Sequence, residues 1–150
     1  MIIVGYQGIG KSTVAYRNDH YVDLESSCFW YMGKRASNWH VYYCRIAEDL
    51  SKQGYVVFVS SHAEVRNRLK KYCDEPVYAI VPSEDLKDEW VKKLHERWQE
   101  TKTQKDYKAY ANAEHTFIEN IREIKKEFGY IEIQDINYNL KKLLEQHNFL

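Results

Sequence analysis

Apolar and polar positions alternate in blocks along this 150-residue chain, and most blocks have the length of one strand or one helix. Short continuous apolar runs are typical of strands that are buried on both faces of a parallel sheet. Longer stretches with apolar residues three or four positions apart are typical of amphipathic helices. The predicted strands cover residues 2–4, 21–24, 55–59, 77–81 and 130–133.

The helical pattern predicts a helix that starts at Lys11 and five more over residues 38–53, 63–72, 83–99, 106–128 and 138–147. In the second of these, the expected apolar stripe consists of Trp39, Tyr42, Tyr43, Ile46, Ala47 and Leu50. Ser83 is a plausible cap, and Gly54 and Gly129 are expected to end helices. Because strands and helices alternate, we predict an α/β fold with a five-stranded parallel sheet, helices on both faces, and one domain over residues 1–150.

Residues 5–12, Gly-Tyr-Gln-Gly-Ile-Gly-Lys-Ser, match the phosphate-binding P-loop pattern G-x-x-x-x-G-K-[ST]. A predicted strand precedes them and a predicted helix follows, which argues against a coincidental glycine turn. In this motif the backbone N–H groups and the lysine bind phosphates, and the serine hydroxyl holds Mg²⁺. We therefore predict ATP and Mg²⁺ as cofactors, bound by Gly5, Gly8, Ile9, Gly10, Lys11, Ser12 and Thr13, with the Thr13 hydroxyl near the α-phosphate.

The order of elements, the P-loop after the first strand and the length near 150 residues resemble the small P-loop kinases. That group includes nucleoside monophosphate, shikimate and gluconate kinases. Three segments carry the resemblance, namely residues 5–12, 21–27 and 56–66. The stretch from Asp23 to Arg66 is most similar to small bacteriophage-encoded kinases described as nucleotide kinases. The resemblance implies a three-layer P-loop kinase fold over most of the chain.

Asp23 and Glu25 follow the second predicted strand, at the carboxyl edge where open α/β sheets bind ligands. They share one side if the strand stays extended. By resemblance, Asp23 is catalytic: it holds Mg²⁺ through water or orients the attacking oxygen, while Glu25 contacts the acceptor. The alternative is that both acids are solvated or cap the next helix.

Ser60, Ser61 and His62 end the third predicted strand, where many P-loop proteins carry an acidic residue. The serines weaken the interpretation as an ATPase motor. Arg66 lies one helical turn after His62, so both can face the same cleft. We expect His62 and Arg66 to bind the acceptor, Arg66 through a phosphate. A surface ion pair of Arg66 with Glu64 or Asp74 is the alternative.

The polar segment 94–108 is the candidate lid. The resemblance implies such a lid, because the small P-loop kinases close an arginine-bearing segment over the transferred phosphoryl group. Arg97 is its one arginine and is the candidate for catalytic charge stabilisation. Other cations nearby are alternatives: Lys92, Lys93, Lys102 and Lys105. Arg97 could equally be an ordinary exposed residue where two rigid helices meet and Trp98 enters the core.

Six aromatic residues between the second and third strands either stack on an acceptor base or build a local core. They are Phe29, Trp30, Tyr31, Trp39, Tyr42 and Tyr43. The basic turn 33–35 either contacts an acceptor phosphate or is solvated.

The chain has 22 basic and 22 acidic residues, and this neutral total argues against a long nucleic acid as partner. Its three cysteines show no C-x-x-C spacing, so neither a disulfide framework nor a zinc site is predicted. The absence of a signal-peptide pattern and of a long apolar segment predicts a cytoplasmic protein without a membrane partner.

These features predict a P-loop kinase that transfers the γ-phosphoryl group of ATP to a small acceptor, with a nucleoside or deoxynucleoside monophosphate favoured. Two alternatives stay open. One is a kinase for another acceptor, such as a nucleic-acid 5′ end or a small hydroxy compound; the other is a non-catalytic NTP-binding regulatory protein. The sequence identifies neither the base nor the sugar of the acceptor, and it leaves homodimer formation open.

Overall fold

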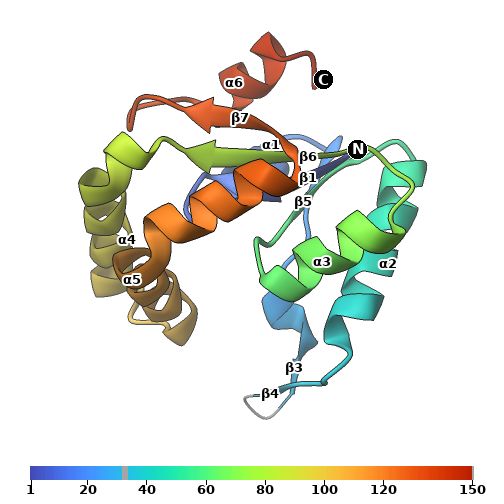
Figure 1. Cartoon of the computed structure of the whole chain (residues 1–150), viewed down its shortest axis with the longest axis horizontal. Helices are drawn as coiled ribbons and strands as arrows, with labels where there is room; N and C mark the ends of the chain where they lie inside the picture. Colours follow the sequence, from blue (N-terminus) through green and yellow to red (C-terminus); the bar gives the residue numbers. More distant parts are fainter. Residues whose placement is uncertain (32–33, 150) are drawn as a thin grey trace.

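The main sheet has five strands in the order β2-β5-β1-β6-β7, and every neighbouring pair is parallel. This computed structural model describes residues 1–31 and 34–149 (Figure 1). The strands are β1 (Ile2–Gly5), β2 (Tyr21–Asp23), β5 (Val56–Val59), β6 (Val77–Pro82) and β7 (Gly129–Ile133). The predicted five-stranded parallel sheet is therefore confirmed.

Helices occupy the connections between these strands, as an α/β fold requires, and α6 follows the last strand. They are α1 (Lys11–Arg17), α2 (Trp39–Lys52), α3 (Ala63–Tyr72), α4 (Lys87–Thr101), α5 (Gln104–Glu127) and α6 (Leu140–Gln146). Short 3₁₀ turns span Ser26–Phe29 and Glu84–Leu86. Helix α1 contacts α6, whereas α2 packs on α3 and β5, and α5 packs on β6. The arrangement is consistent with a three-layer α/β fold.

The two central strands are buried along their whole length, which explains their unbroken apolar sequence. All four residues of β1 and all four of β5 are buried. A strand that is covered on both faces has no solvent side on which polar residues could alternate. The core therefore lies directly beneath the carboxyl edge of the sheet, where β1 leads into the glycine-rich segment.

Helix α2 buries a narrower face than the sequence predicts. Trp39, Tyr43 and Ala47 of the expected stripe are buried, but Tyr42 is 52% and Ile46 40% exposed. The buried row continues through Cys44 and Ser51 instead. Tyr42 and Ile46 lie on the flank of this row, so the prediction was wrong for those two positions.

The ends of the helices agree with the sequence in part. Gly54 follows α2 with a φ of 98°, the left-handed conformation that favours glycine. The Ser83 side chain accepts a hydrogen bond from the Asp85 N–H, but it caps the 3₁₀ turn that precedes α4. Helix α5 ends at Glu127, and Gly129 is the first residue of β7. The prediction that Gly129 ends this helix was therefore wrong, because an extended Phe128 separates the two elements.

Two further features were not predicted. A short antiparallel hairpin pairs β3 (Trp30–Tyr31) with β4 (Lys34–Arg35), and Gly33 of the predicted basic turn lies outside the described residues. Helix α5 has a break at Thr116, whose φ of −135° is not helical. The Thr116 hydroxyl donates to the Asn112 carbonyl at 2.9 Å. Across residues 1–31 and 34–149, no helix combines the length and the apolar character needed to cross a membrane.

Candidate functional site

A cavity of about 640 Å³ opens at the carboxyl ends of β1, β2 and β5. Its walls come from the glycine loop (residues 5–12), the segments that follow β2 and β5, and the hairpin of α4 and α5. Most of the predicted site residues line it together: Gly5, Gly8, Gly10, Lys11, Ser12, Asp23, Glu25, His62, Arg66 and Arg97. The other two, Ile9 and Thr13, line a second cavity of about 400 Å³ beside the same loop.

The glycine loop has a conformation that its glycines make possible. Gly8 and Gly10 have φ values of 86° and 101°, in the left-handed region that other residues rarely adopt. A Cβ atom on Gly5 would lie 2.7 Å from the Ile9 side chain and 2.8 Å from that of Lys11. Gly10 immediately precedes α1, whose first N–H groups have no partner within the helix. The loop therefore presents backbone donors next to the cavity.

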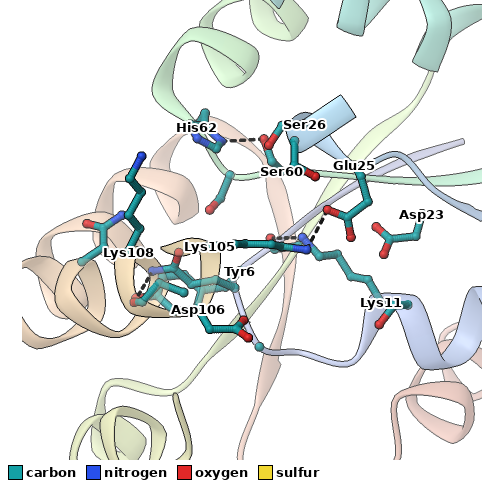
Figure 2. Close-up of a pocket in the computed structure, with 18 of the residues that line it drawn as sticks. Tyr6, Lys11, Asp23, Glu25, Ser26, Ser60, His62, Lys105, Asp106 and Lys108 are labelled. Atoms are coloured by element: carbon teal, nitrogen blue, oxygen red, sulfur yellow. Dashed lines mark hydrogen bonds and ion pairs between the residues drawn. The ribbon is translucent and has the colours of Figure 1, made fainter. Parts of the chain in front are cut away.

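The Lys11 side chain folds over the glycine loop and lies near the carboxylates of Asp23 and Glu25. Its Nζ donates to the Gly5 carbonyl at 3.3 Å. Burial lowers the pKa of Lys11, and the negative charges of Asp23 and Glu25 oppose that shift. In Figure 2, Lys11 and Lys105 reach toward these carboxylates from opposite sides of the cavity. The cation predicted from the motif thus meets the acidic pair predicted after the second strand.

The two carboxylates differ in how they hold a proton. Burial raises the pKa of Asp23; the charge of Lys11 opposes this shift and that of Glu25 adds to it. Burial also acts to raise the pKa of Glu25, but the hydrogen bond and charge of Lys105, together with the charge of Lys11 and a hydrogen bond with Asp23, lower that pKa. The Lys105 Nζ lies 2.8 Å from the Glu25 Oε2. Of the two carboxylates, Glu25 is therefore the more readily ionised and Asp23 the more readily protonated.

The end of β5 is tied to the end of β2 by a buried tyrosine. The Tyr43 hydroxyl donates to the Leu24 carbonyl at 2.6 Å and accepts from the Ser60 N–H at 2.8 Å. Ser60 Oγ and His62 Nδ1 are 2.8 Å apart, and a dashed line marks this hydrogen bond in Figure 2. Burial, followed by the charge of Arg35, lowers the pKa of His62, which favours a neutral imidazole.

Arg66 is buried and bound to α5. Its Nε donates to the Ser61 carbonyl at 2.9 Å, and its guanidinium pairs with Glu127 and, at 3.7 Å, with Glu123. The alternative surface pair with Glu64 or Asp74 was therefore wrong. Arg66 lines the cavity, so its binding of an acceptor phosphate stays a prediction.

Arg97 lies on the hairpin of α4 and α5, half exposed, with its Nε 3.3 Å from Asp106 Oδ1. Asp106 also accepts hydrogen bonds from the hydroxyls of Thr101 and Thr103 near the turn of the hairpin. Trp98 is half-buried against the rings of Tyr107 and Tyr110, at centroid distances of 4.9 and 5.9 Å, and does not belong to the buried core. The segment 94–108 is therefore the tip of a helical hairpin, and its movement stays a prediction.

The aromatic cluster after β2 builds a local core. Phe29, Trp39 and Tyr43 contact one another with centroid distances between 5.5 and 6.2 Å. Trp39 and Tyr43 are buried, whereas Tyr42 is exposed. The side chains of Trp30 and Tyr31 lie outside the described residues. The core alternative is therefore confirmed for Phe29, Trp39 and Tyr43.

One row of cavity residues was missed at the sequence level, although Lys105 was named as an alternative cation. Lys105, Lys108, Asn112 and Asn120 all line the cavity from α5. Their spacing of three, four and eight positions puts them on one face of a helix. This polar periodicity over residues 105–120 was the signal that could have identified them.

No protein-family model matches the chain, and no curated protein matches it.

Proposed function

We propose that this protein is a phosphotransferase that moves the γ-phosphoryl group of ATP to a small acceptor, with a nucleoside or deoxynucleoside monophosphate favoured. The observation that carries the proposal is one juxtaposition: Lys11 and the glycine loop share a cavity with Asp23 and Glu25. A phosphate donor needs the lysine and the loop to bind its phosphates, and a reacting acceptor needs the carboxylates to orient it.

The glycine loop is the proposed donor site. Its backbone N–H groups and Lys11 bind the phosphates, because together they present several donors and one positive charge. The second cavity borders the same loop at Gly10 and Thr13 and has a volume of about 400 Å³. This space accommodates the base and ribose of the donor without competing for the acceptor cavity.

Ser12 and Asp23 are the proposed Mg²⁺ contacts. Both line the cavity, and Mg²⁺ commonly takes one or two carboxylates, several waters and substrate phosphates as ligands. Within the described residues no three His, Cys, Asp or Glu side chains form a metal-binding group, so the substrate has to supply ligands. The bound ion would neutralise the phosphates during transfer.

In the proposed reaction the acceptor oxygen forms a bond to the γ-phosphorus while the bond to the bridging oxygen breaks, which releases ADP. Asp23 orients the attacking oxygen, and Lys11 stabilises the charge that develops on the phosphates. Arg97 adds a second positive charge once it exchanges Asp106 for the transferred group. Catalysis by positioning and charge is what phosphoryl transfer demands.

The charges of the cavity support an anionic acceptor. Four cations besides Lys11 line it: Arg35, Arg97, Lys105 and Lys108. Arginine and lysine are the usual ligands of phosphate groups. A monophosphate fits these charges, and the acidic pair beside Lys11 favours an enzyme over a protein that only binds NTP.

An acceptor screen tests the proposal. Each ribonucleoside and deoxyribonucleoside monophosphate is incubated with ATP, Mg²⁺ and the protein, and ADP formation is measured. The Lys11→Ala variant is the matched control. We expect acceptor-dependent ADP formation by the unmodified chain only. Equal rates for both proteins, or ADP formation that no acceptor increases, would contradict the proposed function.

A further inference from the structure

Four successive carbonyl groups of the glycine loop already have hydrogen-bond donors. Trp90 Nε1 donates to the Gln7 carbonyl at 2.9 Å, and Lys93 Nζ donates to the Gly8 carbonyl at 2.8 Å. The Tyr138 hydroxyl donates to the Ile9 carbonyl at 2.5 Å. The Gly10 carbonyl accepts from the Val14 N–H at 3.3 Å within the first turn of α1. Three of these four donors are side chains from outside the loop.

The direction of these carbonyls fixes the direction of the N–H groups. In a trans peptide the C=O and the following N–H point in opposite directions, and the described chain contains no cis peptide. Holding the Gln7 and Ile9 carbonyls outward therefore turns the N–H groups of Gly8 and Gly10 the other way. Gly8 and Gly10 line the main cavity, and within the described residues neither N–H enters a backbone hydrogen bond. The peptide between them is fixed at both ends, because Lys93 holds the Gly8 carbonyl and the Ile9 N–H donates to the Tyr6 carbonyl at 3.4 Å.

The three side chains form one bracket. The rings of Trp90 and Tyr138 are stacked with centroids 6.0 Å apart and an interplanar angle of 12°. Lys93 Nζ lies 4.5 Å from the Trp90 ring centroid and 5.3 Å from that of Tyr138, in cation–π geometry. Trp90 and Lys93 belong to α4, whereas Tyr138 lies between β7 and α6. The bracket therefore joins two distant segments beneath the loop.

We propose that Trp90 and Tyr138 are positioning residues that keep the Gly8 and Gly10 N–H groups turned toward the donor phosphates, and that Lys93 supports them by fixing the intervening peptide and the bracket. This inference rests on the proposed function, because it needs an anion in the loop. Glycine permits peptide orientations that other residues exclude, so Gly8 and Gly10 give the loop freedom to rotate its peptides. A rotated peptide would aim a carbonyl oxygen at the phosphates and repel them. The bracket removes that freedom before the ligand arrives.

The test compares Tyr138→Phe and Lys93→Met with the unmodified chain. The first removes one hydroxyl and keeps the ring stacked on Trp90; the second removes the ammonium and keeps an apolar stem. Tyr130→Phe is the matched control, because Tyr130 is 47% exposed on β7. Lys93→Arg restores a cationic donor and tests rescue.

Both Lys93 and Tyr138 also line the second cavity, so a contact with the donor base must be separated from loop positioning. Inorganic tripolyphosphate separates them because it has neither base nor ribose. Its dissociation constant and that of Mg·ATP are measured by calorimetry for every variant, and KM and kcat are measured with the acceptor found in the screen.

We expect both variants to bind tripolyphosphate and ATP about tenfold more weakly, the scale of one lost hydrogen bond that orders a binding group. KM for ATP should rise more than kcat falls, and Lys93→Arg should recover most of the affinity. Weaker binding of ATP alone, with tripolyphosphate unaffected, would overturn the inference in favour of a base contact. Unchanged binding of both ligands would overturn it outright. Failure of the unmodified chain to bind either ligand would instead contradict the proposed function.

Discussion

The two walls of the main cavity are built in opposite ways. The loop wall rests on the buried core: Val4, Tyr6 and Ile9 are at most 1% exposed, and the loop carbonyls have partners. The hairpin wall carries exposed side chains whose ion pairs, such as Lys105 with Glu25, lie near solvent. Buried packing fixes geometry, whereas exposed ion pairs exchange partners at little cost. We therefore expect the donor side of the proposed site to be rigid and the acceptor side to be adjustable.

The largest effect is expected on the rigid wall, from Lys11→Ala. Removing the ammonium group should lower kcat by about a thousandfold, the upper range for one positioned electrostatic group. Steady-state kinetics measure the loss, and circular dichroism with thermal unfolding checks the fold. Lys52→Ala, an exposed lysine on α2, is the control and should retain activity. Near-normal turnover by Lys11→Ala would remove the kinase interpretation.

Asp23→Asn should lower kcat by about a hundredfold, because the attacking oxygen loses its orienting charge. The variant should also remove the acidic limb of the pH–rate profile, since that limb reports ionisation of Asp23. Asp74→Asn, a change of an exposed acid, is the control. A change confined to the acceptor KM would show that Asp23 binds the acceptor and has no role in the chemical step.

Asp23→Asn should lower activity but raise the thermal stability of the protein. Burial raises the pKa of Asp23 above its ordinary value of 3.8, so the folded state holds the proton more tightly than the unfolded chain. Stability therefore falls as pH rises from that value through the folded pKa, where Asp23 ionises. At neutral pH and without ligand, Asp23→Asn should unfold at a higher temperature than the unmodified chain. A lower unfolding temperature would show that the charge of Lys11 outweighs the burial cost.

On the adjustable wall, Arg97→Ala should lower kcat by about tenfold or more and leave stability nearly unchanged, because its ion pair with Asp106 is half exposed. Segment 94–108 should exchange its amide hydrogens faster without ligand than with a bisubstrate analogue. Arg45→Ala, an exposed arginine on α2, is the control. Equal protection in both states would exclude the lid, and unchanged kcat would exclude the catalytic role.

The smallest effect is expected from Lys105→Met. Without the ammonium the pKa of Glu25 should rise, because Lys105 supplies the largest effect that lowers it. The acceptor KM should increase by about threefold, in keeping with an exposed ion pair. NMR titration of Glu25 and initial-rate kinetics measure the two quantities, with Lys126→Met as control. An unchanged pKa would show that Lys11 alone keeps Glu25 ionised.

Sequence patterns predicted the parts of the molecule that depend on neighbours in the chain. Residues 2–4 and 55–59 are apolar because both faces of their strands are covered, and α3 was predicted with its observed ends. The face of α2 and the start of β7 at Gly129 were mispredicted, because packing against distant elements decides them. Local propensity does not contain that information.

The site residues also fall into those that the sequence identifies and those that only the folded structure brings together. The glycine loop and the acidic pair are contiguous motifs, so the sequence identified them. The contact between Lys105 and Glu25 joins residues 80 positions apart, and that between Arg66 and Glu127 joins residues 61 positions apart. Only the folded arrangement of α5 over the sheet brings these side chains together.

The non-helical residue Thr116 divides α5 into two helical parts with different surroundings. Phe117, Ile121 and Ile124 after the break are buried, and Lys105 and Lys108 before it are exposed cavity residues. The division is not complete, because Asp106 and Ala113 before the break are also buried and Asn120 after it lines the cavity. A continuous helix would resist bending along its whole length and would transmit any displacement of its tip to the core. A non-helical residue confines the bending to one place. If segment 94–108 moves as predicted, we expect α5 to bend at Thr116, so that the sheet beneath it keeps its position.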